Sequence, residues 1–483
     1  MDRYDLCVVG AGPAGIAGAF RAVDLGKRVA LIDGGPLGGA GIFDGALSSK
    51  TLWHLSADYS RACRSDRGYD GSALVASWPA VRAQVDAACR EAQALIVRQL
   101  AAFARPGVGR GTIDHILGRG TFVGLETLEV ATVDGSRRLE ADRFLLAVGS
   151  RPRVPPTIAV DGVRVMTSDQ IEHLPALPGR LAIIGAGVVG CEYATVFAHF
   201  KQTAVELFDR QPRILPFEDE DVAAVVASRF AEIGVHVHRK ARIERVVVIG
   251  DEVEIGWLDE AGAVQHRRYD RVLVATGRAP SLGQLGLDLA GVSIDANGGV
   301  TVERTRTTAP HVWAAGDVTP DLMLANLAEL EARHAVEDMY GRDPSPIVHE
   351  AQSAIYFLSP EVAAVGLDEQ MARAKGIPYR AAIVSNALNR RNLAMRAPVG
   401  FVKLLARPDG HLLGLRVVGP QAGTCIQGVA LLIGQGGTLA AVDRCVHPHP
   451  AVTEGVLEAA RLLLGTSLYK PDAMDGLCRI VSG

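Results

Sequence analysis

The chain has 483 residues, of which 48% are hydrophobic and 22% are charged, and its formal net charge is −4. This length exceeds what one hydrophobic core supports, so we expect about three domains that are globular and well packed. The weakly negative charge excludes a dedicated nucleic-acid binder, and the lack of an apolar run of about eighteen residues excludes a membrane span. The first residues, MDRYDLCVVG, lead directly into a predicted strand without a signal-peptide pattern, so we expect a cytoplasmic protein.

The cysteines are dispersed, and none of their spacings is typical of a metal site. We therefore predict no metal ion, and we expect buried, inert thiols for most of the seven, which are Cys7, Cys63, Cys89, Cys191, Cys425, Cys445 and Cys478.

The N-terminal segment has the order of a dinucleotide-binding βαβ unit. A β-rich run over residues 6–9 leads into a glycine triplet and an alanine-rich helix, and a second strand over 29–32 ends at Asp33. The glycines permit a tight turn, a close approach of a pyrophosphate and close helix–strand packing, in the order Gly10, Gly12 and Gly15. Asp33 is then placed to accept hydrogen bonds from a ribose, so we predict a first dinucleotide site here.

The same unit recurs in the middle of the chain, over residues 179–210. Its glycines are Gly185, Gly187 and Gly190, and its second strand ends at Asp209. Two complete units predict two dinucleotides on separate modules. A carboxylate repels a 2′-phosphate and favours NAD(H), but the nearby Arg210 and Arg213 leave NADP(H) possible.

Three further segments combine a strand with a small-residue turn. LLAVGSRP (145–152) contains Gly149 and VLVATGRAP (272–280) contains Gly277, and both predict points where the chain crosses between domains. In HVWAAGDVT (311–319), a strand runs into Gly316 and Asp317, and this acid is suited to bind a cofactor polyol. Helical apolar spacing over 80–105 predicts one long helix.

Four C-terminal motifs complete a pattern that covers nearly the whole chain, namely SPEVAAVG (359–366), GFVKLL (400–405), LGLRVVGP (413–420) and HPHPAVTEG (447–455). With the two glycine fingerprints, they resemble the flavoprotein pyridine nucleotide-disulfide oxidoreductases, a family that includes dihydrolipoamide dehydrogenase, glutathione reductase and the soluble pyridine nucleotide transhydrogenase. The resemblance implies an α/β fold like that of glutathione reductase. That fold has two Rossmann-like dinucleotide-binding domains and a C-terminal α+β dimerisation domain.

The resemblance and the turn signals together give the expected domain boundaries. We expect an FAD-binding domain at 1–150 and 275–345, an NAD(P)-binding domain at 151–274 and a dimerisation domain at 346–483 that makes a homodimer. The resemblance also implies FAD on the first fingerprint, with Asp317 on its ribityl chain. It further implies Lys50 beside the flavin N5 and Glu192 as the partner of that lysine, since a cation there favours a reduced, anionic flavin.

The loop GGAGIFDGALSSK (38–50) departs from the family pattern G-G-x-C-x-x-x-x-C-x-x-S-K. Aligned on its glycines and on Lys50, the two positions of the redox-active cysteines hold Gly41 and Ala46. The relay from flavin through a disulfide to a thiol substrate is therefore not expected. Because both replacements are small, we also expect open space beside the flavin, unless Phe43 or Leu47 fills it.

The C-terminal motif HPHPAVTEG matches the family's acid–base pair at His449 and Glu454. A carboxylate that orients an imidazole keeps a proton available near neutral pH. Two interpretations remain: His449 protonates a reduced acceptor, or it is an interface residue without a chemical role.

The leading hypothesis is an FAD-dependent NAD(P)H oxidoreductase that passes hydride equivalents from NADH to a non-disulfide acceptor. The acceptor is a quinone, a second nicotinamide or a partner protein's redox centre. One alternative is dihydrolipoamide dehydrogenase-type activity that uses other thiols, for which Cys478 is a candidate. Another is a catalytically quiet flavoprotein with a structural or regulatory role.

Overall fold

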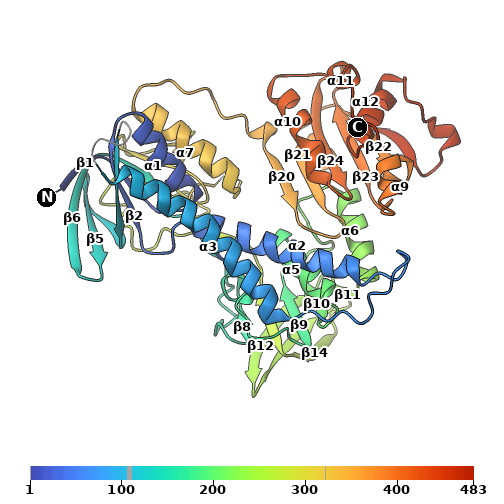
Figure 1. The fold of residues 1–483 in the computed structure, drawn as a ribbon, viewed down its shortest axis with the longest axis horizontal. Coiled ribbons are helices and arrows are strands. Elements are labelled where there is room, and N and C mark those ends of the chain that lie inside the picture. Colours follow the sequence, from blue (N-terminus) through green and yellow to red (C-terminus); the bar gives the residue numbers. More distant parts are fainter. Residues whose placement is uncertain (1, 106–110, 321) are drawn as a thin grey trace. The chain divides into compact units, whose positions relative to one another are not determined.

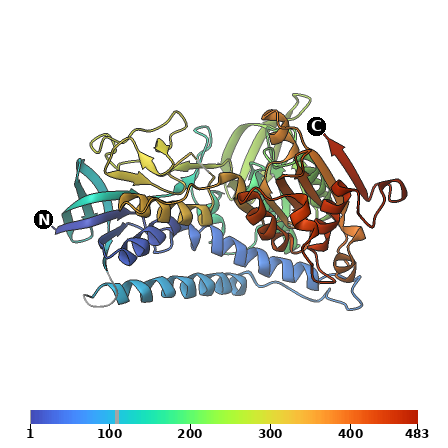
Figure 2. The ribbon, with the colours of Figure 1, turned by 90° about the horizontal axis from the view of Figure 1, so that it is seen from above.

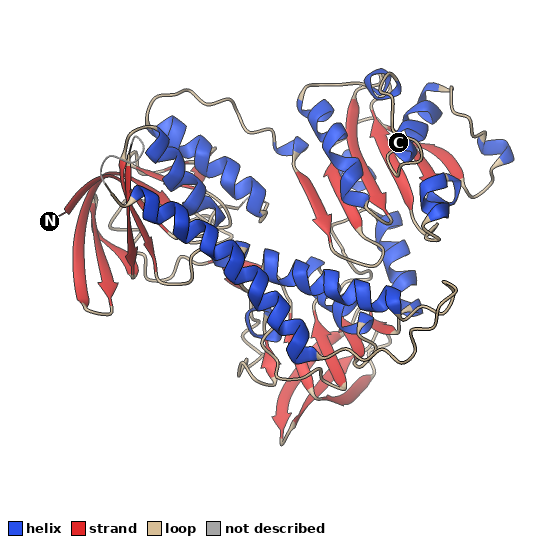
Figure 3. Ribbon diagram, in the orientation of Figure 1, coloured by secondary structure: helices blue, strands red, loops and turns tan. Residues whose placement is uncertain are grey.

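The computed structural model describes residues 2–105, 111–320 and 322–483 (Figure 1). The chain forms two compact units. The first comprises Met1–Leu177 and Ala275–Ile347, and the second comprises Pro178–Val274 and Val348–Gly483. Each unit combines helices with strands, as expected for the predicted α/β class (Figure 3).

The first unit is built around a sheet with the strand order β17-β18-β19-β6-β1-β2-β3, to which a β4–β5 hairpin is joined through β6. Its central strands are parallel, since β1 pairs with both β2 and β6, and β2 pairs with β3. The strands of this unit are β1 (Asp2–Val9), β2 (Arg28–Asp33), β3 (Thr112–Leu117), β4 (Arg119–Gly124), β5 (Thr127–Thr132), β6 (Gly135–Leu146), β7 (Ser150–Pro152), β8 (Val165–Met166), β16 (Arg278–Pro280), β17 (Val302–Glu303), β18 (Arg306–Thr307) and β19 (Val312–Ala314).

Helices cover one face of this sheet. The helices of the unit are α1 (Pro13–Asp24), α2 (Ala46–Ala62), α3 (Trp78–Phe103), α4 (Ser168–Ile171) and α7 (Ala325–Met339), with a 3₁₀ turn at Gly39–Gly41. Helices α1 and α7 lie side by side, and their small side chains pack with the core strands and with the end of α3 (Figures 1 and 2). The opposite face packs against the β4–β6 meander and the segment around residues 285–300.

The part of the second unit at Pro178–Val274 has a parallel sheet in the order β11-β10-β9-β15, with the two strands of the second glycine fingerprint, β9 and β10, at its centre. A three-stranded antiparallel sheet, β12-β13-β14, follows it. The elements are β9 (Arg180–Ile184), α5 (Val188–His199), β10 (Ala204–Phe208), α6 (Glu220–Glu232), β11 (Val235–His238), β12 (Arg242–Ile249), β13 (Glu252–Leu258), β14 (Val264–Tyr269) and β15 (Arg271–Val274). Helix α5 is buried on all sides from Gly190 to His199, which agrees with its mostly apolar sequence; Glu192 is the buried charged residue in it.

The C-terminal half of the second unit is an antiparallel sheet in the order β20-β21-β24-β23-β22-β25. Helices α10, α11 and α12 pack on one face (Figure 1), and α8 packs on the other. The elements are β20 (Ser353–Tyr356), β21 (Val362–Gly366), α8 (Glu369–Ala374), β22 (Arg380–Ser385), α9 (Arg390–Ala394), β23 (Phe401–Ala406), β24 (Leu412–Val418), α10 (Ile426–Gly434), α11 (Leu439–Asp443), α12 (Glu454–Leu464) and β25 (Cys478–Ser482), with 3₁₀ turns at His349–Ala351, Asn386–Leu388, Ala422–Cys425 and Pro471–Ala473.

Candidate active site

The two predicted glycine turns have nearly the same backbone structure. Gly10 and Gly185 have φ values of +106° and +109°, in a region that residues other than glycine rarely adopt. Each donates its N–H to a carbonyl near the end of the second strand of its unit, Gly10 to the Ile32 carbonyl at 2.7 Å and Gly185 to the Phe208 carbonyl at 2.8 Å. The first position of each turn therefore needs glycine, because the tight turn predicted from the sequence requires this positive φ.

The third glycine of each turn provides close helix–strand packing. A Cβ atom at Gly15 would lie 1.8 Å from the Gly10 carbonyl oxygen, and one at Gly190 would lie 1.9 Å from the Gly185 carbonyl oxygen. The second glycine of the first turn is not needed for packing in this way, because a Cβ atom at Gly12 would meet nothing within 4 Å. Gly12 and Gly187 are the N-caps of α1 and α5, so each turn presents a helix N-terminus, where anions bind favourably.

Both predicted ribose-binding acids also hold their own turns. Asp33 accepts the N–H of Ala11 at 2.5 Å through one oxygen and the N–H of Gly35 at 2.8 Å through the other. Asp209 repeats this arrangement with Ala186 at 2.6 Å and Gln211 at 2.8 Å. With an open approach at the second glycine, a helix N-terminus and an acid at the end of the second strand, both turns fit a dinucleotide.

The two crossover turns, centred on Gly149 and Gly277, lie next to the predicted polyol-binding acid. Strands β7 and β16 follow these turns and pair antiparallel. Beside this strand pair, the Ser150 hydroxyl donates to Asp317 at 2.6 Å and accepts from Arg278 Nε at 2.7 Å. Ser150 and Arg278 orient the Asp317 carboxylate, a role that sequence reasoning missed, although both belong to the motifs that it had singled out.

The cysteine-free loop is held by contacts that the sequence did not predict. Cys89 of α3 donates its thiol hydrogen to the Ile42 carbonyl at 3.3 Å, and Asp44 bonds to His173 Nε2 at 2.6 Å. At Gly41, a Cβ atom would lie only 2.5 Å from Pro13 Cγ. The Pro13 ring therefore lies where a side chain at residue 41 would begin, and the open space expected beside the flavin stays a prediction.

Lys50 and Glu192 belong to different units. Lys50 lies on α2 in the first unit, where its Nζ is 3.3 Å from the Ser49 hydroxyl. Glu192 is buried in α5 of the second unit and accepts the Phe357 N–H at 2.9 Å. Phe357 is a second positioning residue that the sequence did not indicate, because it acts through its backbone. The pairing of Lys50 with Glu192 stays a prediction.

All seven cysteines are free, and five of them are buried. Burial raises the pKa of Cys7 and Cys425 to about 12 and that of Cys89 to about 11, and it also raises the pKa of Cys191 and Cys478. These thiols are therefore poor nucleophiles near neutral pH. Cys445 differs, since it is exposed.

His449 and Glu454 are brought together as predicted from the C-terminal motif. His449 Nδ1 lies 2.7 Å from one Glu454 oxygen, and the other oxygen accepts the Ala451 N–H at 2.9 Å. Burial tends to raise the pKa of Glu454, but the hydrogen bonds from His449 and Ala451 outweigh it and hold the pKa below its usual value. The carboxylate thus orients an imidazole whose side chain is 56% exposed.

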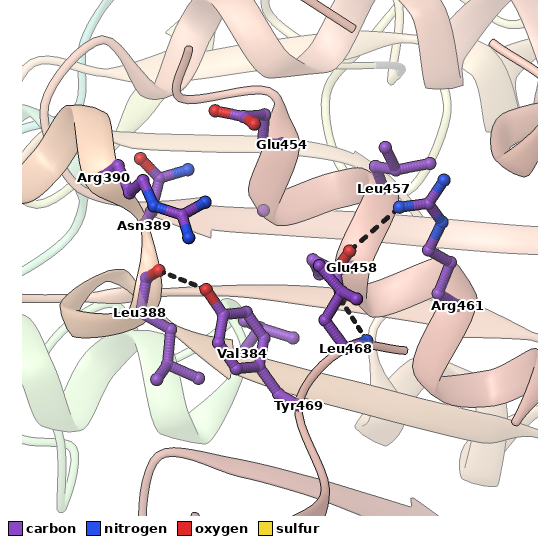
Figure 4. Close-up of a pocket in the computed structure, with 11 residues that line it drawn as sticks. Val384, Leu388, Asn389, Arg390, Glu454, Leu457, Glu458, Arg461, Leu468 and Tyr469 are labelled. Atoms are coloured by element: carbon purple, nitrogen blue, oxygen red, sulfur yellow. Dashed lines mark hydrogen bonds and ion pairs between the residues drawn. The ribbon is translucent and has the colours of Figure 1, made fainter. Parts of the chain in front are cut away.

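A small, partly open pocket of about 100 Å³ lies beside Glu454, between α12 and the segment that joins β22 to α9 (Figure 4). Its apolar residues include Leu388, Leu457 and Tyr469. Its lining residues are Val384, Leu388, Asn389, Arg390, Glu454, Gly455, Leu457, Glu458, Arg461, Leu468 and Tyr469. The pocket combines an apolar wall with charged groups next to the His449–Glu454 pair.

Two structural findings concern functions other than redox chemistry. In the part of the chain that the structure describes, every helix is too short or too polar to cross a bilayer. Among the same residues, no group of three or more His, Cys, Asp or Glu side chains is arranged to hold a metal ion.

Two family models match the chain. The pyridine nucleotide-disulphide oxidoreductase model matches residues 4–332, and the dimerisation-domain model of the same enzymes matches residues 352–460. The chain belongs to this family. The cofactors predicted from the two fingerprints, FAD and NAD(H), are those that the family uses, and the second match supports the predicted homodimer.

Curated relatives and solved structures agree with this assignment. The chain is 31% identical to the dihydrolipoyl dehydrogenase of Geobacillus stearothermophilus over 96% of both proteins. It is 30% identical to dihydrolipoyl dehydrogenase 2 of Haloarcula marismortui, over 96% of this chain and 98% of that protein. The crystal structure of LpdA from Mycobacterium tuberculosis has a TM-score of 0.87 at 29% identity, and the match covers 96% of this chain and 100% of that one. The predicted fold is therefore confirmed, and the chain is a flavin-dependent oxidoreductase.

Proposed function

We propose that this oxidoreductase transfers electrons from NADH to an acceptor that is not a disulfide. The observation that carries the proposal is the loop 38–50, in which Gly41 and Ala46 occupy the positions assigned to the family's redox-active cysteines. A side chain at residue 41 would also collide with Pro13, so the loop is adapted to a residue without a side chain there. With a quinone as acceptor, the reaction is NADH + H⁺ + quinone → NAD⁺ + quinol, in which the quinone gains two electrons and two protons; a second nicotinamide would instead take up the hydride alone.

Each part of the chain has a defined task in this reaction. The turns at Gly10–Gly15 and Gly185–Gly190 hold the two dinucleotides by their phosphates, and Asp317 holds the flavin's polyol. Bound FAD supplies the two-electron redox chemistry. Lys50 places a positive charge beside the flavin, and Glu192 is the partner that the family resemblance implies for it. His449, oriented by Glu454, supplies the proton that the reduced acceptor takes up.

The dimerisation half provides a place for a small acceptor beside this proton donor. Leu388, Leu457 and Tyr469 give the pocket an apolar wall, which suits a ring. Arg390 lies at the same pocket and offers a donor to a carbonyl oxygen. These features favour a quinone-like acceptor.

The test is anaerobic mixing of the holoenzyme with NADH or NADPH, followed by mixing with quinones, nicotinamide analogues, lipoamide and glutathione disulfide. We expect rapid flavin reduction, faster with NADH, and rapid reoxidation by quinones or nicotinamides but not by the disulfides. No long-wavelength charge-transfer band should form, because no thiolate lies beside the flavin. Failure of NADH to bleach the flavin would instead support a catalytically quiet flavoprotein.

A second candidate function is dihydrolipoamide dehydrogenase activity, which is favoured by the names of the curated relatives and by the retained His449–Glu454 pair. It requires two thiols that can form a disulfide, and the seven cysteines are all unpaired. Steady oxidation of dihydrolipoamide by NAD⁺ that disappears in a Cys478→Ser variant would favour this candidate over the first.

A further inference from the structure

The two glycine turns share a backbone structure but differ in what lies over them. At Gly12, a Cβ atom would meet nothing within 4 Å, whereas at Gly187 it would lie 4.0 Å from Cε1 of Phe217. The Phe217 side chain is large and apolar, yet the residue is 54% exposed. An exposed aromatic ring therefore stands beside the turn of the second fingerprint, whereas no described side chain lies within 4 Å of the corresponding position at Gly12.

The segment that carries Phe217 is folded back onto this turn. The Leu215 N–H donates to the Ala186 carbonyl at 2.8 Å, inside the glycine turn itself. The Arg213 guanidinium donates to the Glu218 carbonyl at 2.6 Å and to the Pro216 carbonyl at 2.9 Å, which closes residues 213–218 into a compact loop. These bonds fix the backbone on both sides of Phe217.

Buried ion pairs anchor the same segment from the dimerisation half of the unit. Glu218 lies 2.5 Å from Arg416 Nε and accepts the Tyr356 hydroxyl at 2.9 Å. Asp219 accepts from Lys403 at 2.8 Å, and the Lys403 side chain is only 1% exposed. Buried charges that lose a partner are costly, so these contacts hold the segment firmly. Phe217 is thus exposed because its neighbours leave it no other position, and not because the segment is loose.

We propose that Phe217 forms a wall of the NAD(H) site and packs against the ribose and pyrophosphate of the coenzyme bound at Gly187. Ribose carbon atoms offer an apolar surface to the ring, which gains by leaving water. The ring also excludes water from the helix N-terminus, which strengthens the bonds between backbone amides and phosphates. Because Phe217 lies beside Gly187, at the turn that would bind the phosphates, we expect it to act on coenzyme affinity and not on hydride transfer. The inference depends on the coenzyme and not on the identity of the acceptor.

The experiment compares wild-type holoenzyme with Phe217→Ala and Phe217→Leu. The dissociation constants of NAD⁺ and of ADP-ribose are measured by calorimetry on the oxidised enzyme, with KM for NADH, kcat and FAD content. We expect Phe217→Ala to weaken both ligands by about tenfold and to raise KM by a similar factor, with kcat and FAD content unchanged. The affinities of Phe217→Leu for both ligands should lie between those of the wild type and of Phe217→Ala. ADP-ribose serves as a probe because it contains the segment that the ring covers but lacks the nicotinamide.

A matched control is Tyr69→Ala, because Tyr69 is a similarly exposed aromatic residue, at 53%, in the first unit. It should leave both affinities unchanged. Affinities of Phe217→Ala within twofold of the wild type, or tighter than the wild type, would overturn the proposal. A parallel loss of FAD would overturn it as well, since the ring would then act on folding. None of these results depends on which acceptor oxidises the enzyme, so the proposed function is tested separately.

Discussion

Replacing the second and third glycines of the first turn by alanine should separate cofactor binding from folding. In Gly15→Ala, the new Cβ would lie 1.8 Å from the Gly10 carbonyl oxygen, whereas real Cβ contacts stay beyond 3.0 Å, so α1 must move away by about 1.2 Å. Such backbone overlap in a packed core costs about 3 kcal/mol or more, and we expect a large loss of stability. In Gly12→Ala, the Cβ meets nothing within 4 Å, so the apoprotein should be as stable as the wild type.

The effect on FAD is expected to be strong in Gly12→Ala despite its intact fold. A methyl group at residue 12 keeps the pyrophosphate from reaching the backbone amides of the turn. Losing two charge-assisted hydrogen bonds at about 1.5–3 kcal/mol each lowers FAD affinity by roughly hundredfold or more.

Thermal unfolding of the apoproteins and fluorescence titration with FAD measure the two effects independently, which matters because bound cofactor itself raises the melting temperature. An unchanged FAD affinity in Gly12→Ala would refute the assignment of this turn as the phosphate cradle. A Gly15→Ala apoprotein as stable as the wild type would refute the packing argument.

Three further predictions follow from individual side chains. Lys403→Met leaves Asp219 buried without its cation and should lower the free energy of unfolding by about 3–5 kcal/mol, whereas Arg306→Met at an exposed ion pair should cost less than about 1 kcal/mol in the same urea titration. Burial opposes ionisation of Glu206, but its hydrogen bonds prevail and lower its pKa from 4.5 to about 2. The ionised Glu206, whose side chain is 15% exposed, therefore stabilises the folded protein by about 3 kcal/mol above pH 4.5, and this stabilisation is lost as the pH falls towards 2. The measurement is the free energy of unfolding of the wild type and of Glu206→Gln at several pH values. A difference between the two proteins that did not shrink between pH 4.5 and 2 would contradict the prediction. His449→Ala should lower turnover with a quinone by about tenfold to a thousandfold while the dimer persists in size-exclusion chromatography; unchanged turnover would mean that the imidazole only packs.

Local signals in the sequence predicted the parts of the fold that depend on local rules. The strands expected at 6–9 and 29–32 lie within β1 and β2, and the helix expected over 80–105 is α3 (Trp78–Phe103). The helix begins two residues before the predicted range, at Trp78. Apolar periodicity did not indicate this residue, because its side chain makes a tertiary contact in which the indole N–H donates to the Leu174 carbonyl at 2.6 Å. The glycine turns were predictable because positive φ values and close backbone approaches restrict those positions to one residue type.

The contacts that the sequence could not reveal join residues far apart in the chain. Lys403 stands in an apolar strand motif, and nothing near it indicates that its partner is Asp219, 184 residues earlier. The position of Phe217 over Gly187 depends on that same anchor. Of the candidate site, the His449–Glu454 pair was predictable because both residues lie in one short motif with a five-residue spacing. The collision at Gly41 with Pro13 was not, because it is a matter of packing between a loop and a helix start.

The loop without sulfur has a pharmacological consequence. Trivalent arsenicals, gold compounds and alkylating electrophiles poison dithiol enzymes by capturing their paired thiolates, and this loop offers them nothing to capture. Among the described residues, Cys445 is the exposed cysteine, and the buried thiols have raised pKa values. The enzyme should therefore keep its activity in such reagents, and maleimide chemistry should label the exposed Cys445 in preference to the buried cysteines.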